Sequence, residues 1–301
     1  MSRARIQPVL AVLIAANLSV VQGSPATGMP VIGVVEAGSA FRLDHATVSG
    51  NATLFEGATI ETGIGQSSQE LRNGARVTLL PDSKGRFYDD HMVLERGQGR
   101  LDRATGYFFE ARGLTIQPET GTSTGRVALQ AGAGVQVAAL TGSLRVLNAQ
   151  RMVVAKVLPG APLAFSPQTG GGSGATRVTG RLVNKGGHYV LTDETTNVTV
   201  EVTGPGLKKE EGRRVEISGF LDPTATPVSD ATQVIRVTGI TRLPAGTAAA
   251  GTGGTAAGGG WSGLAISGTT IAIIGGVAAA AVVGGLAAAG SLSGGSSAVS
   301  R

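Results

Sequence analysis

Apolar and polar side chains alternate in short runs through residues 31–165, and a glycine interrupts them about every ten residues. Clear examples are residues 127–129, 135–137 and 144–146. Strict alternation is typical of a half-buried strand, and no window keeps a 3.6-residue apolar stripe over three helical turns. The pattern therefore predicts an all-β domain, a β-sandwich or a short β-solenoid, over residues 31–167.

The dipeptide Asn73-Gly74 lies between two strand-like runs, residues 69–72 and 75–80. Asn-Gly between alternating runs is the strongest short-range signal for a β-hairpin with a type I′ turn. We therefore expect a hairpin here, with a positive φ at Gly74.

A second β-patterned unit covers residues 176–243, after a Gly/Ser-rich linker at residues 168–175. Five strands are predicted, at residues 177–183, 188–192, 198–202, 214–221 and 233–243. The runs around Gly180 and Gly219 resemble those of a small OB-type barrel, in which glycine relieves crowding where strands bend. OB barrels that stack bases need exposed aromatic rings, and we expect Tyr189 and Phe220 to belong to the core instead.

The two ends of the chain differ from the body. Arg3 and Arg5 precede an apolar stretch at residues 9–21 and then small residues, so residues 1–26 are predicted to be a cleaved secretory signal. An uncleaved anchor or a buried helix is the alternative interpretation. The stretch of 13 residues is about 20 Å long as a helix, which is too short to span a bilayer.

Residues 244–300 contain no Asp, Glu, Lys or Arg. Residues 244–260 have the composition of a flexible Gly/Ala linker. Residues 261–289 begin at Trp261 and include the apolar stretch 264–286, long enough to cross a membrane as a helix, and residues 290–301 would form a short tail. Small residues four apart, such as Gly275 and Ala279, would suit a homo-oligomer of such helices. A disordered Gly/Ala tail is the alternative.

The net charge of +5 and the pI near 10.0 would suit a nucleic-acid partner only if the basic residues were clustered. Residues 27–169 carry 13 Lys and Arg against 12 Asp and Glu, and residues 170–243 carry 9 against 8. Because the signs are interspersed in both units, we expect no nucleic-acid partner.

Residues that could support catalysis are sparse. The chain has no Cys and three His, and it lacks the metalloprotease, α/β-hydrolase and P-loop motifs. On a strand, only Asp89 and His91 of the run Asp89-Asp90-His91 would share a face, and two ligands do not make a cation site. His45 and His188 stand alone. We therefore predict no enzyme activity, cofactor or metal.

Two further sequence matches carry little weight. Gly258, Gly260 and Gly263 match a dinucleotide-binding pattern, but they follow no predicted strand. Asn51 and Asn197 begin glycosylation sequons.

Several glycine-turn motifs resemble the FecR-type periplasmic domain over about 130 residues. Residues 51–63 (NATLFEGATIETG) resemble its motif "tLfeGdtieTg", and residues 73–83 resemble "dGsrvtLgpnS". Residues 140–146 and 157–165 resemble its closing stretch. In these motifs Gly57, Gly63, Gly74 and Gly142 stand where the chain needs a positive φ or a tight reversal.

The resemblance implies a β-rich module for sensing or interaction in the bacterial envelope. Classical FecR-type proteins carry a cytoplasmic N-terminal segment that engages a sigma factor, whereas this chain begins with a predicted signal, so direct sigma-factor regulation is not expected. We expect an exported, non-enzymatic protein on the periplasmic face of the inner membrane, held by its C-terminal helix and binding an envelope protein or glycan. A passive structural component and a hydrolase with an unfamiliar site are the alternatives.

Overall fold

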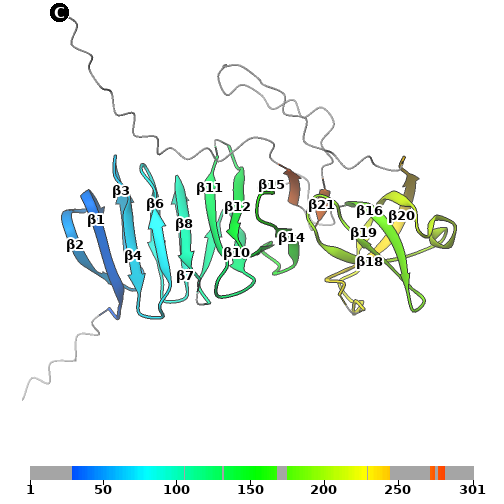
Figure 1. The fold of residues 1–301 in the computed structure, drawn as a ribbon, viewed down its shortest axis with the longest axis horizontal. Helices are drawn as coiled ribbons and strands as arrows, with labels where there is room; N and C mark the ends of the chain where they lie inside the picture. The colour runs from blue at the N-terminus through cyan, green and yellow to red at the C-terminus, as the bar shows by residue number, and fades with distance from the viewer. Residues whose placement is uncertain are drawn as a thin grey trace, which may run out of the picture.

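Alternating burial runs through the strands of the N-terminal unit, as in Ser67–Leu71, where every second residue is buried. The computed structural model describes residues 29–104, 106–130, 132–167, 175–228, 230–244, 272–274 and 277–281. Apart from one 3-10 helix, every regular element in these ranges is a β-strand (Figure 1). The all-β fold class is confirmed.

One sheet of the N-terminal unit is antiparallel throughout and has the order β2-β1-β4-β5-β8-β11-β12-β15. Its strands are β1 (Val31–Leu43), β2 (Ala46–Phe55), β4 (Ser67–Leu71), β5 (Arg76–Leu79), β8 (Gln98–Arg103), β11 (Thr124–Leu129), β12 (Val135–Thr141) and β15 (Leu163–Pro167). The predicted runs at residues 127–129 and 135–137 lie in β11 and β12.

The second sheet has the order β3-β6-β7-β9-β10-β13-β14, in which only β7 and β9 are parallel. Its strands are β3 (Thr59–Thr62), β6 (Lys84–Phe87), β7 (His91–Arg96), β9 (Phe108–Ala111), β10 (Leu114–Pro118), β13 (Leu144–Leu147) and β14 (Val153–Val157). The long strand β1 joins the two sheets, because residues 33–37 pair with β4 and residues 41–43 pair with β3.

The hydrophobic core lies between these two sheets. A Cβ atom at Gly99 of β8 would stand 3.0 Å from the Met92 and Phe109 side chains of the opposite sheet. A Cβ atom at Gly125 of β11 would overlap the Leu144 side chain of β13. Glycine at these strand positions therefore makes room for large side chains at native packing density.

The second unit is a closed five-stranded barrel. Its elements are β16 (Thr176–Lys185), β17 (His188–Thr192), β18 (Thr199–Thr203), η1 (Leu207–Glu210), β19 (Arg214–Leu221) and β20 (Val234–Arg242). The ring runs β16-β17-β18-β20-β19 and closes back on β16, with only β18 and β20 parallel. The five predicted strands are thus found, each within a few residues of its expected bounds.

Two barrel glycines have the role expected of them. A Cβ atom at Gly180 would overlap the carbonyl oxygen of Thr192, and one at Gly219 would overlap that of Arg236. Backbone therefore passes too close to these strand positions for any side chain.

The two units are in direct contact along β14. The Lys156 amide donates to the carbonyl of Thr196 at 2.6 Å, and the Gln233 side chain donates to the carbonyl of Val153 at 2.5 Å. The Thr196 turn is held by the buried carboxylate of Asp193, whose pKa is raised by burial although neighbouring N–H and O–H groups donate to it. Contacts from the barrel therefore cover the outer edge of the second sheet.

The membrane helix expected over residues 261–289 is wrong for the part of that range that the structure describes. Residues 272–274 and 277–281 form two strands, β21 (Ala272–Ile274) and β22 (Val277–Ala281), and β22 pairs with β15 in antiparallel register. Among the described residues, no helix is both long and apolar enough to cross a membrane. The β15 edge offers unpaired backbone groups, and pairing with them satisfies the backbone of the Ala-rich segment as well as a helix would.

Two finer expectations also need correction, the turn type at Asn73-Gly74 and the burial of Phe220. Gly74 has φ 84, but Asn73 has no positive φ, and the pair Leu71 and Ala75 closes a three-residue loop, so the hairpin turn is not type I′. The other glycines of the FecR-like motifs agree with expectation, because Gly63 lies in a bend and Gly57 and Gly142 have φ 78 and 61.

Phe220 is 48% exposed, because the buried Gly219 beside it occupies the inward position at a bulge of β19. Tyr189 is partly buried and packs against the core as expected. The predicted signal at 1–26 and tail at 290–301 lie outside the described residues, as do the linkers at 168–175 and 244–260 except for residues 175 and 244.

Candidate functional site

The outer face of the second sheet carries a row of six side chains that we call the aromatic–basic strip. Its members, in order across the sheet, are Tyr88, His91, Phe108, Gln117, Arg145 and Lys156. Cross-strand register places His91 beside Phe108, Gln117 beside Arg145, and Arg145 beside Lys156.

Strand alternation explains why these side chains face outward. Their chain neighbours Phe87, Met92, Phe109, Ile116, Val146 and Ala155 are buried in the core. Because successive side chains point to opposite faces, each buried neighbour turns the strip residue beside it toward the surface.

Three stacked rings form one end of the strip. The ring centroids of Tyr88 and His91 are 4.4 Å apart and those of His91 and Phe108 are 5.2 Å apart, with interplanar angles of 10° in both pairs. Beneath them the buried Tyr107 hydroxyl donates to the carbonyl of His91 at 2.6 Å, and burial raises the pKa of this phenol. A hydrogen bond from a buried side chain therefore holds the backbone of His91, which carries the central ring.

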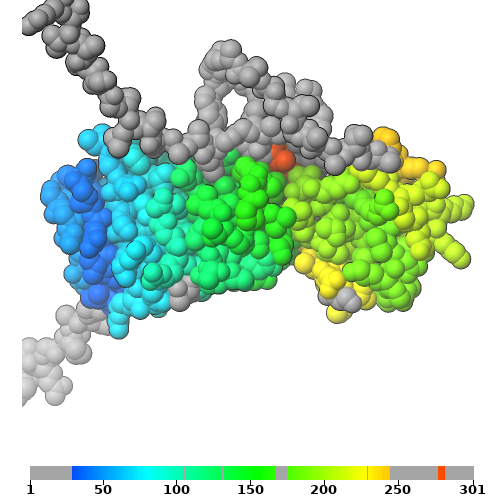
Figure 2. Space-filling view, in the orientation of Figure 1, coloured from blue at the N-terminus to red at the C-terminus, as the bar shows by residue number. Residues whose placement is uncertain are grey.

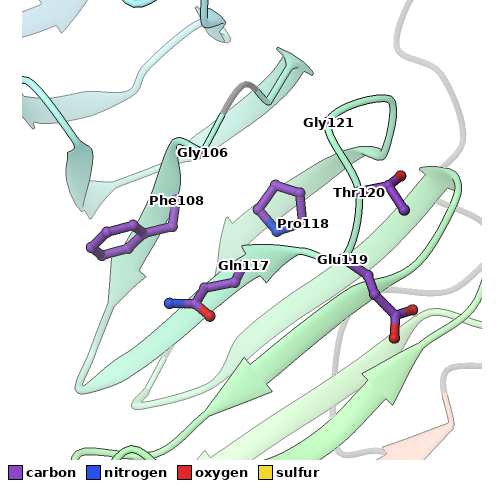
Figure 3. Close-up of a pocket in the computed structure, with 7 residues that line it drawn as sticks. All are labelled: Gly106, Phe108, Gln117, Pro118, Glu119, Thr120 and Gly121. Carbon is purple, nitrogen blue, oxygen red and sulfur yellow. The ribbon is translucent and has the colours of Figure 1, made fainter.

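A cavity of about 310 Å³ opens beside this aromatic end (Figure 3). Its walls are the turn at Gly106, the ring of Phe108, and the end of β10 with the loop that follows it, Gln117, Pro118, Glu119, Thr120 and Gly121. Phe108 and Gln117 project from the neighbouring strands β9 and β10 (Figure 3). The residues around the cavity thus include the aromatic Phe108, the amide residue Gln117 and Pro118, whereas the carboxylate of Glu119 points away from Phe108 (Figure 3).

The other end of the strip is basic and partly neutralised. The carboxylate of Glu119 lies 2.8 Å from Lys156 Nζ and also accepts a hydrogen bond from Ser143, and these two contacts lower the pKa of Glu119. Within the described part of the chain no ion pair engages Arg145, whose side chain is exposed. Arg145 is therefore the cation at this end that can meet an anionic ligand.

The residues considered from the sequence are not brought together as a cation site. Strand β7 begins at His91, so Asp89 and Asp90 precede the strand, and His91 Nδ1 contacts Asp90 Oδ1 at 2.6 Å instead of sharing a face with Asp89. Across the described ranges no group of three or more His, Asp or Glu side chains could hold a metal ion.

The other two histidines lie elsewhere. His45 has a positive φ in the turn between β1 and β2, and His188 Nδ1 lies 2.8 Å from the carboxylate of Glu201 on the barrel. Sequence reasoning missed the strip because its members come from elements scattered between residues 88 and 156. The alternation of apolar and polar residues predicts the individual strands, but it does not predict that β7 pairs with β9.

Comparisons with known proteins add little to this picture. No family model matches the chain, and no curated protein matches it. Among solved structures, the Cpx pathway activator NlpE from Escherichia coli is similar at 11% identity, over 61% of this chain and 89% of that one, with a TM-score of 0.20.

Proposed function

We propose that this chain is a non-enzymatic protein of the bacterial cell envelope that binds a glycan on the aromatic–basic strip. The placement outside the cytoplasm is supported by the signal-like residues 1–26 and by the FecR-like glycine motifs. The single observation that carries the binding function is the stack of Tyr88, His91 and Phe108 beside a cavity lined by both polar and apolar residues.

Sugar rings fit this chemistry because they have one apolar C–H face and a rim of hydroxyl groups. An aromatic face supplies apolar contact area, and a few placed polar groups fix orientation. Phe108 would pack against the sugar ring, and the Gln117 amide would exchange hydrogen bonds with hydroxyl groups. The cavity volume of about 310 Å³ lies at the lower end of small-ligand sites, which suits one or two sugar units.

The strip extends beyond the cavity toward the exposed Arg145, which favours an acidic glycan over a neutral one. A guanidinium binds a carboxylate through two parallel hydrogen bonds. Glu119 is engaged by Lys156 and Ser143, so it serves to hold the loop and is not poised as a general acid or base.

The binding function can be tested with two soluble probes, a muropeptide fragment that carries carboxylates and a neutral chitooligosaccharide. We expect Phe108→Ala to weaken binding of both by roughly tenfold, a loss of about 1.4 kcal/mol. Arg145→Ala should weaken only the acidic probe. Isothermal titration calorimetry gives both affinities.

Matched controls come from the barrel. Phe220→Ala removes an exposed ring, and Arg181→Ala removes an exposed cation that forms no ion pair within the described ranges. Both should bind like the unaltered protein. Equal losses in strip and barrel variants, or no binding of either probe, would refute the glycan proposal and leave a passive structural role as the better account.

A further inference from the structure

The C-terminal hairpin β21–β22 occupies the open edge of β15, the last strand of the first sheet. Five residue pairs join β22 to β15, from Leu163 with Ala281 to Pro167 with Val277. Figure 2 shows the orange β22 at the surface where the two units meet. Without this hairpin, the N–H and C=O groups along one side of β15 would have no strand partner among the described elements.

Strand β22 places two small side chains in the hydrophobic core. Val277 and Ala279 are buried, but the other three residues of β22 are partly buried or exposed alanines. On its other side the hairpin lies against β16 of the barrel, where Arg177 and Ile273 are the one pair in β-bridge register. The main-chain pairing of β22 with β15 is a contact that any strand of the same length and register can make equally well.

The connection to the hairpin is long. Residues 245–271, 27 positions rich in Gly, Ala and Thr, join the barrel to β21. A chain of this length can extend to roughly 90 Å. The sequence therefore gives the hairpin enough length to reach β15 of a neighbouring molecule.

We propose that the edge of β15 binds the β21–β22 hairpin of a second copy of this chain, so that the protein assembles by exchanging C-terminal hairpins. A detached hairpin leaves two complementary surfaces, an uncharged apolar strand and an unpaired edge, on every copy. When two copies exchange hairpins, each β15 edge pairs with the β22 strand of the other copy through the same residue pairs as within one molecule. The resulting dimer has twofold symmetry. This inference is independent of glycan binding.

The absence of cysteine from the chain makes a direct test simple. Ala164 of β15 and Ala280 of β22 are register partners and both are half-buried. Directly opposite Cβ atoms on paired strands are close enough for a disulfide after small adjustments. Two full-length chains with different tags, one Ala164→Cys and the other Ala280→Cys, are co-expressed, oxidised mildly and examined on a non-reducing gel.

We expect a disulfide-linked heterodimer. It should increase severalfold when the Ala164→Cys chain also carries Ala279→Lys, because a lysine at this buried position keeps that chain's own hairpin off β15. The same lysine placed in the Ala280→Cys chain should abolish the heterodimer.

A matched control replaces Ala164→Cys by Ser49→Cys, an exposed small residue on β2 at the other end of the sheet. Equal crosslinking to this control would show random collision and overturn the proposal. A double variant, Ala164→Cys with Ala280→Cys, that forms only intrachain disulfides would also overturn it.

Discussion

Gly142 lies in the turn between β12 and β13, where substitution by alanine meets two separate obstacles. Its φ is 61, in the left-handed region that disfavours L side chains. A Cβ atom there would also overlap the Ser123 hydroxyl and stand 3.0 Å from Ser123 Cα. Ser123 is fully buried and contacts Thr120 of the cavity loop, so it cannot move without disturbing that loop.

The expected loss of stability follows from the left-handed backbone and from the overlap with Ser123. The left-handed conformation costs about 1–2 kcal/mol, and forced overlap in a packed site costs about 1–3 kcal/mol. Alanine also restricts the unfolded chain, which returns about 0.4–1 kcal/mol. Gly142→Ala should therefore lower the free energy of unfolding by about 2–4 kcal/mol and Tm by roughly 5–15 °C.

Substitutions at two other glycines separate the cost of the left-handed backbone from the cost of the overlap. Gly57 has φ 78 with open space around its Cβ direction, so Gly57→Ala should cost only about 1 kcal/mol. Gly63 has neither a positive φ nor a close neighbour, so Gly63→Ala should leave Tm nearly unchanged. Calorimetric melting of the three variants tests the series, and a Gly142→Ala protein that melts like Gly63→Ala would refute the reasoning.

Three further outcomes are expected. Gly74→Val should destabilise the β4–β5 hairpin by roughly 1–3 kcal/mol in urea unfolding, because Gly74 has φ 84; an unchanged midpoint would contradict this. The pKa of Asp222 is lowered to about 2 by hydrogen bonds from Thr224 and from Arg236. The stability from these contacts should persist above the ordinary carboxyl pKa and disappear as pH falls through about 2, and an NMR titration midpoint near 4 would exclude them. Limited proteolysis should cut within residues 168–174 and leave two protected fragments, whereas one resistant fragment spanning both units would argue against a linker there.

Local periodicity determined the strands of this protein. Alternation at residues 127–129, 135–137 and 144–146 placed β11, β12 and β13, and the five barrel strands were found near their predicted bounds. These predictions succeed because the side-chain period of two is a property of each short segment and its neighbours. The positive φ at Gly74 followed in the same way from local turn chemistry, although the loop length did not.

Only the tertiary structure decided which strands meet. The parallel pairing of β7 with β9 puts His91 against Phe108, and no feature of either segment announces it. Residues 277–281 show the same limit. Their apolar, Ala-rich composition suits a helix or a strand equally, and the edge of β15 selects the strand because main-chain hydrogen bonding there depends on a partner more than 100 positions away.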